Sequence, residues 1–379
     1  MAKQIIIFLG GNYNSDLQRV EQVLPKYLSQ SYQTYCFEYP QFRKLFKILL
    51  GIIPLTEKIS PNLYIYHSFG LFPGGRNIAI FNKINHWLNF KLFNILFKKN
   101  EKSTNFISFT PETAYLKNKI KSKHIIYYAI DDYIALPFWK NYLAKKQFKT
   151  LEKKFVKYSQ KIITVSTSLC LRYKKLHPDV FYFPTPFDSK EFENTNYSVP
   201  SDLAKLKKPI IGFIGAFYDW RINLKLLLKT FSILKNYSFV AIGSLKIKNK
   251  FYLQKLQSLS NFYYLGHKEN YEVGNYIQNF KVCLIPYKTN TYGQYAYPVK
   301  INEYLNFGKP IVSTNLPAIE ELGKNNLIYW ALNNQDFIKK IKSAVNENKN
   351  NQIIKKRKIY ALNHSWKRQL KNLIKIIEK

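Results

Sequence analysis

The strongest chemical pattern in the sequence is YPVKINEYLNFGKPIVST, which begins at Tyr297. A helix opening at Pro298 and Val299 would direct free backbone N–H groups and its positive end towards an anion, and Lys300 adds charge in the first turn. Glu303, one turn later, could accept two hydrogen bonds from neighbouring ribose hydroxyls. The stretch therefore predicts a cradle for a nucleotide diphosphate. An ordinary helix-to-strand connection with a capping glycine is the alternative.

Two glycine-containing loops each follow a predicted strand. In GFIGAFYDWR, Gly215 would let backbone approach a phosphate closely, and Arg221 could form a bidentate contact with it. Gly10 and Gly11 follow the first predicted strand and allow the same two interpretations, phosphate approach or a tight turn. Neither loop matches GxGxxG or a Walker A motif, which argues against a nicotinamide dehydrogenase or a P-loop ATPase.

Asp131 and Asp132 follow another predicted strand, in YYAIDDY. Adjacent carboxylates in a strand point to opposite faces, so at most one reaches a substrate easily, and a helix cap or solvated turn explains the pair equally well. No spacing of His, Asp and Glu resembles a metal site, and there is no GxSxG nucleophile motif. The three cysteines form no CxxC pair, so neither a zinc site nor a disulfide framework is indicated.

Short apolar runs alternate with stretches of helical period, which predicts α/β architecture around parallel sheets. A length of 379 residues suggests two domains. We expect a Rossmann-like domain over 1–192, a linker over 193–208, a second Rossmann-like domain over 209–350 and a basic helix over 351–379. The expected strands in the first half are 5–9, 62–66, 105–109, 124–129 and 161–165, and the expected helices are 16–29, 79–97, 112–118 and 139–158. In the second half the expected strands are 209–214, 238–242, 262–265, 282–286 and 310–313, and the expected helices include 224–234 and 300–307.

The chain is strongly basic, with 59 Lys and Arg against 23 Asp and Glu and a net charge of +36. Nucleic acid, anionic lipid or a phosphorylated substrate could balance that charge, although its even spread also fits drift in composition. Two segments, 42–55 and 85–102, are basic, aromatic and amphipathic. Each could lie on an anionic bilayer surface, or could be a core-facing helix with a solvated back.

Other features of the sequence indicate the cellular compartment of the protein. The start of the chain reads as a buried strand and lacks the features of a signal peptide, and its most apolar stretch is too short and too interrupted to span a bilayer. Unpaired cysteines fit a reducing compartment. We therefore expect a cytoplasmic protein that is soluble or lies on the inner face of the membrane.

Six landmarks in the right order resemble one family, the retaining GT-B glycosyltransferases of family 4, and its bacterial polysaccharide branch that includes teichuronic-acid glycosyltransferases. The landmarks are Gln18-Arg19, YYAIDDY, KIITVSTSL, PTPFD, PVKINEYLNFGKPIVST and NHSW. The resemblance implies a GT-B fold, with two Rossmann-like domains facing a central cleft and a C-terminal helix that packs back on the body.

The resemblance also implies roles for individual residues. Glu303 corresponds to the glutamate that holds the donor ribose, and Lys300 and Arg221 fall near the basic residues that hold the diphosphate. Asp132 lies where the family places a polar residue beside the reacting sugar. Tyr295 stands where the family has an earlier glutamate. The loops that approach the donor phosphates contain Gly10, Gly11 and Gly215, and the donor helix opens at Pro298 and Val299.

The implied activity is transfer of a hexose from a nucleotide-diphosphate sugar to a lipid-linked or polysaccharide acceptor, in cell-surface polysaccharide biosynthesis. The resemblance implies retention of anomeric configuration, no metal and no other cofactor. An anionic membrane surface is an expected partner, and nucleic acid is not. The alternatives are a GT-B epimerase that releases an isomerised sugar, a basic nucleic-acid-binding protein and an inactive scaffold.

Overall fold

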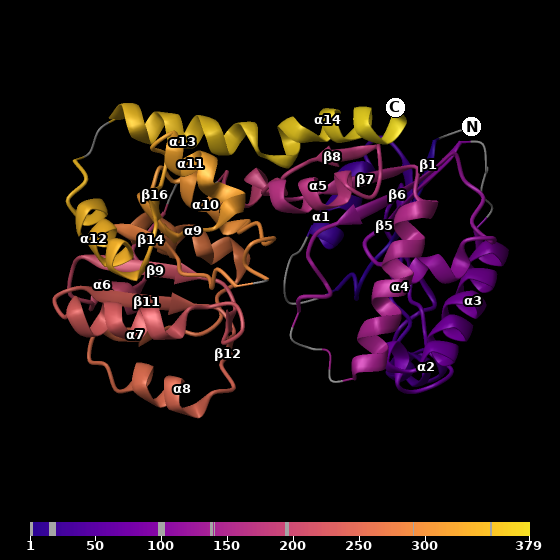
Figure 1. Cartoon of the computed structure of the whole chain (residues 1–379), viewed down its shortest axis with the longest axis horizontal. Helices are drawn as coiled ribbons and strands as arrows, with labels where there is room; N and C mark the ends of the chain where they lie inside the picture. The colour runs from indigo at the N-terminus through magenta and orange to yellow at the C-terminus, as the bar shows by residue number, and fades with distance from the viewer. Residues whose placement is uncertain are drawn as a thin grey trace. The chain divides into compact units, whose positions relative to one another are not determined.

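The computed structural model describes residues 3–14, 20–97, 103–136, 139, 141–193, 197–290, 292–348 and 351–379. The chain forms two compact units (Figure 1). Unit 1 is Met1–Pro184 together with Leu370–Lys379, and unit 2 is Thr185–Gln369. Gln18 and Arg19 lie outside the described residues. Within the described ranges, no helix is long and apolar enough to cross a bilayer.

Unit 1 is built on an eight-stranded sheet in the order β3-β4-β2-β1-β5-β6-β7-β8. All pairings are parallel except that of β3 with β4. The strands are β1 Gln4–Phe8, β2 Gln33–Phe37, β3 Thr56–Ser60, β4 Leu63–Tyr66, β5 Thr104–Ser108, β6 His124–Ala129, β7 Lys161–Thr164 and β8 Val180–Tyr182. The five expected strands are confirmed, and β2, β3 and β8 are additional.

The helices of unit 1 are α1 Val20–Leu28, α2 Phe42–Leu49, α3 Ala79–Leu96, α4 Tyr142–Tyr158 and α5 Thr167–Lys174, with 3-10 helices η1 Gly75–Asn77 and η2 Pro111–Leu116. The expected helix over 112–118 is wrong in type, because Thr110 and Pro111 start a short 3-10 helix there. Part of the expected helix over 16–29 lies outside the described residues. Aromatic side chains fill the core, where Phe8 stacks on Phe37 with ring centroids 4.0 Å apart.

Unit 2 is built on a six-stranded parallel sheet in the order β13-β11-β9-β14-β15-β16. Its strands are β9 Ile210–Ile214, β11 Ser238–Ile242, β13 Phe262–Tyr264, β14 Val282–Ile285, β15 Ile311–Thr314 and β16 Tyr329–Ala331, and a separate ribbon pairs β10 Phe217–Tyr218 with β12 Leu245–Lys246. The expected strands of the second half are all present, and β10, β12 and β16 are additional. In each unit the strand order reverses beside the first strand, as in doubly wound folds.

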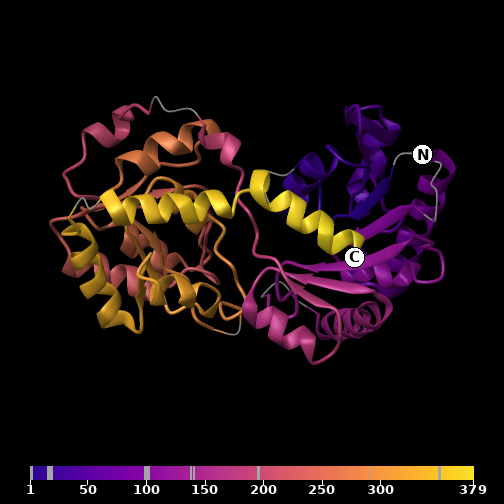
Figure 2. The same ribbon diagram turned by 90° about the horizontal axis from the view of Figure 1, so that it is seen from above.

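Helices of unit 2 connect these strands, and Figure 2 shows them from a second direction. They are α6 Ser201–Ala204, α7 Leu224–Ile233, α8 Lys250–Gln257, α9 Asn270–Asn279, α10 Lys300–Asn306, α11 Glu320–Lys324, α12 Asn334–Val345 and α13 Asn351–Asn363, with 3-10 helices η3 Ser189–Phe192 and η4 Pro317–Ile319. The last helix, α14 Trp366–Glu378, begins in unit 2 and ends in unit 1.

The units divide the chain earlier than the expected boundary at 192. Phe187 and Phe192 are buried in the core of unit 2, which draws 185–192 into that unit. The described part of the expected linker, 193 and 197–208, also belongs to unit 2, and Leu203 is buried there. Residues 194–196 lie outside the described residues.

The C-terminal basic segment forms two helices, α13 and α14, where a single helix was expected. The break follows from backbone pairing with Phe187, whose N–H donates to His364 O (3.2 Å) and whose O accepts from Trp366 N (3.1 Å). The expected packing of the last helix is confirmed within unit 1, because Leu373 and Ile377 are fully buried. Lys161 Nζ also donates to Ile377 O (3.0 Å).

Candidate functional site

The switch point of unit 2 lies at the carboxyl ends of β9 and β14, which are neighbours in the sheet. Doubly wound sheets bind ligands at this place. The two loops that leave these strands are joined to each other, since Asn223 N donates to Pro286 O (2.8 Å) and Lys288 N donates to Arg221 O (2.7 Å). A bridge between Ile222 and Tyr287 adds a third link. The backbone of Arg221 is thereby fixed at the switch point, and its expected role in binding a phosphate stays a prediction.

Aromatic rings hold the Arg221 side chain. Its Cζ lies 5.0 Å from the ring centroid of Trp220, 5.4 Å from that of Tyr292 and 5.5 Å from that of Tyr287. Arg221 Nη2 also donates to the Tyr292 hydroxyl. These cation–π contacts and the hydrogen bond orient the guanidinium of Arg221.

The loops after β9 and β11 meet backbone to backbone at two glycines. Gly215 has φ +147° and Gly243 has φ +122°, values that L side chains rarely adopt. A Cβ on Gly243 would lie 2.3 Å from Gly215 O, so a side chain there would separate the loops. The backbone at Gly215 therefore lies close to the loop after β11, and its expected approach to a phosphate stays a prediction.

Helix α10 begins at Lys300, two residues after Pro298, and Val299 is its N-cap residue with αR geometry. Lys300 Nζ donates to Glu303 Oε2 (2.8 Å), and the Glu303 side chain is 10% exposed. The next residue, Tyr304, accepts a hydrogen bond on its hydroxyl from Ile214 N (2.8 Å), at the last residue of β9. Helix α10, which carries Lys300 and Glu303, is thereby tied to the carboxyl end of the first strand of unit 2.

The far end of α10 is fixed by α13. Gly308 has φ +67° and ends the helix, as the sequence predicts, with its N–H donating to Leu305 O (2.8 Å). Arg357, which is buried, donates to Gly308 O (3.3 Å) and pairs through both Nη atoms with Glu347 (2.6 and 2.8 Å). This contact between α13 and the end of α10 could not be predicted from the sequence, because Arg357 belongs to a segment whose pattern indicates only a basic helix.

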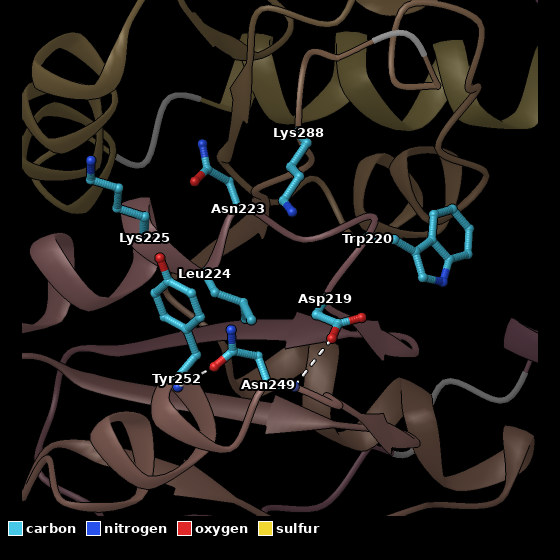
Figure 3. A pocket seen from close by; sticks show the side chains of 8 residues that line it. All are labelled: Asp219, Trp220, Asn223, Leu224, Lys225, Asn249, Tyr252 and Lys288. Atoms are coloured by element: carbon cyan, nitrogen blue, oxygen red, sulfur yellow. Dashed lines mark hydrogen bonds between the residues drawn. The ribbon is translucent and has the colours of Figure 1, made fainter. Parts of the chain in front are cut away.

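A hollow of about 330 Å³ opens on unit 2 beside these loops (Figure 3). Lys225 and Lys288 give it positive charge, and Asp219 accepts from the backbone N–H groups of Lys248 (3.0 Å) and Asn249 (3.3 Å). Its lining residues are Asp219, Trp220, Asn223, Leu224, Lys225, Asn249, Tyr252 and Lys288. Trp220 and Lys288 also adjoin Arg221, so the hollow extends the same loop region. It was not foreseen from the sequence.

The switch point of unit 1 lies at the ends of β1 and β5, and its loop donors are used within the unit. Gly10 N donates to Glu21 Oε2 (2.7 Å), and Gly10 O accepts from Arg76 Nη2 (3.0 Å). Arg76 Nε in turn donates to Glu112 Oε2 (2.9 Å). Among the described residues, none comes within 4 Å of the position of a Cβ on Gly11, whose backbone O accepts from Tyr39 N (3.1 Å). Both glycines are thus held by backbone contacts, and Gly11 is open on its Cβ side.

Glu112 collects hydrogen bonds from several elements of unit 1. Besides Arg76 it accepts from Asn82 Nδ2 (2.8 Å), Thr110 Oγ1 (2.8 Å) and the Tyr39 hydroxyl (3.1 Å). Burial alone would raise the pKa of this carboxyl, but the charge of Arg76 and the hydrogen bonds outweigh burial and lower the pKa. Glu112 is therefore an ionised structural centre.

Asp132 lies in the loop after β6 and uses both carboxylate oxygens within unit 1. Oδ1 accepts from Ile134 N (3.1 Å) and Ala135 N (3.3 Å), and Oδ2 pairs with Arg172 Nη1 (2.9 Å). Arg172 also pairs with Glu152 (3.0 Å). This geometry matches the turn-capping alternative for Asp132 and adds an ion pair.

A second charged cluster in unit 1 was not predicted. Glu38, directly after β2, accepts from Lys44 Nζ and from Tyr13 N (2.6 Å), and it contacts His67 Nδ1 (2.8 Å). The other ring nitrogen of His67 contacts Glu57 (3.1 Å). Burial would lower the pKa of His67, but the two carboxylates outweigh burial and raise the pKa. The one signal in the sequence was the position of His67 after a predicted strand.

The expected site residues therefore form two groups, each within its own unit. Gly215, Arg221, Pro298, Val299, Lys300 and Glu303 lie on loops and helix α10 of unit 2, and Gly10, Gly11 and Asp132 follow strands of unit 1. Tyr295 lies in the turn after β14, where its N–H donates to Tyr292 O (3.0 Å). Among the residues that the structure describes, no three His, Cys, Asp or Glu side chains gather as a metal site would need.

Comparison with known proteins finds a family match within unit 2. Residues 208–347, which include Gly215, Arg221, Lys300 and Glu303, match the family model described as Glycosyl transferases group 1. The chain carries a glycosyl transferases group 1 domain. A relative from Bacillus subtilis (strain 168), provisionally named as the teichuronic acid biosynthesis glycosyltransferase TuaH, is 24% identical over 168 residues. The match spans 44% of this chain and 42% of that relative.

Solved structures extend the likeness beyond the group 1 domain. Sucrose-phosphate synthase from Thermosynechococcus elongatus has a TM-score of 0.76 at 11% identity and is covered over 98% of both chains. HepE from Anabaena, solved in complex with UDP and glucose, has a TM-score of 0.65 at 12% identity, covering 96% of this chain and 95% of that one. The chain therefore has the GT-B fold expected from its sequence.

Proposed function

We propose that the protein is a hexosyltransferase that moves a sugar from a nucleotide-diphosphate sugar to a lipid-linked or polysaccharide acceptor in cell-surface polysaccharide biosynthesis. The observation that carries the proposal is the switch point of the group 1 domain, where Arg221 is fixed in the loop after β9 and helix α10, which carries Lys300 and Glu303, is tied through Tyr304 to the end of the same strand. A bound diphosphate would meet both cations there. The name of the Bacillus relative and the UDP in the HepE structure support the donor and acceptor classes.

Each residue has a role in this proposal. Arg221 and Lys300 stabilise the charge that develops on the departing diphosphate, and Glu303 accepts hydrogen bonds from the donor ribose. Gly215 leaves space for backbone approach to a phosphate, and the open side of Gly11 does the same in unit 1. Pro298 and Val299 set the start of α10. Gly10 and Asp132 position their loops, because their polar groups are held by Glu21 and Arg172.

The reaction proceeds with retention and without a metal in this proposal. The bond between the anomeric carbon and the diphosphate oxygen breaks, the acceptor oxygen bonds to the same face of that carbon, and the acceptor proton passes to the departing diphosphate. No protein base is needed. The anomeric configuration of the product, read by NMR, tests retention, and turnover in excess chelator tests the absence of a metal. An isomerised sugar released without an acceptor would instead support the epimerase alternative.

The deciding test is Glu303→Ala. Losing a charged partner of two ribose hydroxyls should lower kcat/KM for the nucleotide sugar by about 100-fold or more. Glu321→Ala, which removes an exposed carboxylate of unit 2, is the matched control and should leave turnover unchanged. A Glu303→Ala enzyme within a few-fold of wild type would overturn the ribose role, and with it the assignment of this strand end as the donor site.

A further inference from the structure

Helix α2 is inverted relative to a core helix. The one side chain that it buries is Lys44, which pairs with Glu38 under the sheet edge. Its apolar side chains face outwards, with Phe46 52%, Leu49 73% and Leu50 74% exposed, and Ile52 in the following turn is 64% exposed. Isolated exposed apolar residues are normal, but four within seven positions form a patch that needs a partner.

Helix α3 also exposes apolar side chains, although its buried face packs in the core through Phe90 and Phe93, which are 2% and 0% exposed. The buried face also carries polar side chains that bind loop backbone, since Asn89 Nδ2 donates to Phe69 O (2.6 Å) and Asn85 Oδ1 accepts from Leu71 N (2.9 Å). The outer face carries Ile80 and Trp87, which are 56% and 45% exposed. The core-facing alternative expected for this segment therefore describes one face of α3, but the outer face is partly apolar rather than a purely polar, solvated back.

The two outward faces belong to neighbouring elements. The backbone of Phe69 pairs with Gln41, the residue directly before α2, and also with Asn89 of α3. A flat partner could therefore contact both helices together.

The charge of these faces selects the partner. Exposed cations stand between the apolar side chains, namely Arg43 and Lys47 on α2 and Lys83 and Lys91 on α3. The sequence has no Asp or Glu over 39–56 or over 58–100. Lys91 lies 5.5 Å from the Trp87 ring, the pairing of aromatic ring and amine that suits the boundary between lipid headgroups and acyl chains. A surface that binds a protein would be expected to carry both acidic and basic side chains around its edge. An anionic bilayer instead suits a surface that combines cations with apolar side chains.

We propose that the outward faces of α2 and α3 dock the protein on an anionic lipid bilayer. Phe46, Leu49, Leu50 and Ile52 enter the headgroup boundary, and Arg43, Lys47 and Lys83 contact lipid phosphates. This places the protein on a membrane surface as a peripheral protein, which fits the inner face of the cell membrane. The docking stands on this surface alone and does not depend on the transfer reaction.

The test is flotation of the full chain with vesicles of phosphatidylglycerol and phosphatidylcholine, compared with phosphatidylcholine alone. We expect binding to the anionic vesicles that weakens with salt. Leu49→Ser with Leu50→Ser should weaken it about tenfold or more, and so should Lys47→Glu with Lys83→Glu. The matched controls remove equally exposed side chains elsewhere on unit 1, Leu143→Ser with Leu171→Ser and Lys149→Glu with Lys153→Glu, and should bind as wild type does.

Several results would overturn the docking proposal. They are equal binding to neutral and anionic vesicles, unchanged binding of the Leu49 and Leu50 variant, or no flotation at low salt, which would leave a protein partner for this surface. Nucleotide-sugar turnover of each variant on a soluble acceptor serves as the folding control. Loss of flotation with normal turnover concerns docking alone, whereas loss of turnover in Glu303→Ala with normal flotation concerns the donor site alone.

Discussion

Both units place an arginine at the switch point of the sheet, but they hold it differently. In unit 1, Arg76 pairs with Glu112, contacts Gly10 O and stacks 4.2 Å from the ring centroid of Tyr39. In unit 2, Arg221 is held by three aromatic rings, one of which, Tyr292, also accepts a hydrogen bond from it. In unit 1 a carboxylate holds the guanidinium within the fold, whereas in unit 2 aromatic rings orient it. We therefore expect the same position in the fold to serve cohesion in unit 1 and, under the proposed function, anion binding in unit 2.

The largest expected effect comes from removing the arginine of unit 2. Arg221→Met should lower kcat/KM for the nucleotide sugar by about 100- to 1,000-fold, because the departing diphosphate loses a positioned cation. The melting temperature should change little, since the aromatic rings around the side chain still pack. Lys229→Met, on the exposed side of α7, is the control. Full activity with a large drop in melting temperature would show that Arg221 acts as Arg76 does, and the comparison would fail.

The next effect concerns the carboxylate of unit 1. Glu112→Gln leaves the Arg76 charge without its partner and should lower the free energy of unfolding by about 3 kcal/mol. Its lowered pKa gives the sign of the pH dependence. The stability from Glu112 is present above the ordinary pKa of a glutamate and is lost as pH falls through the folded pKa. Denaturant titrations at pH 7 and below 4.5 measure this, with the exposed Asp179→Asn as control. Unchanged stability at pH 7 would refute a cohesive role.

The smallest effect belongs to His67, whose two ring nitrogens contact carboxylates. Its pKa is raised, so the stability from the imidazolium is fully present below the ordinary histidine pKa of about 6.5 and is lost as pH rises through the folded pKa. His67→Gln should remove that slope and cost about 1 kcal/mol at pH 6. Melting curves of both proteins between pH 6 and 8.5 check this. Parallel curves would mean that His67 does not carry the charge.

Much of the fold could be predicted because parallel strands buried on both faces appear as short apolar runs, as Ile5, Ile6 and Ile7 do in β1. Strand β2 escaped prediction because Gln33 and Thr34 break the run, although Thr34 is fully buried. The helical period of 79–97 predicted the bounds of α3 to within one residue, and Phe90 and Phe93 lie on its buried face. Periodicity indicates which residues share a face, but it did not indicate that Asn85 and Asn89 on the buried face bind loop backbone.

The residues of the candidate site that lie close together in the sequence were predictable. Lys300 and Glu303 stand one turn apart, so their pairing follows from helix geometry. The rings around Arg221 were not predictable, because Tyr287 and Tyr292 come from a distant segment that meets the first loop only through the strand order. The requirement for glycine at position 243 was not predictable either, because it arises from the backbone of Gly215, which follows another strand.

The return of the chain's last ten residues to unit 1 has a consequence for synthesis. Leu373 and Ile377 complete its interior, and Glu378 accepts from the Tyr32 hydroxyl (2.6 Å). A ribosome delivers these residues only after it has made unit 2, so Leu373 and Ile377 reach unit 1 after the rest of that unit has been made. A frameshift or nonsense codon near residue 370 would therefore expose apolar surface in unit 1.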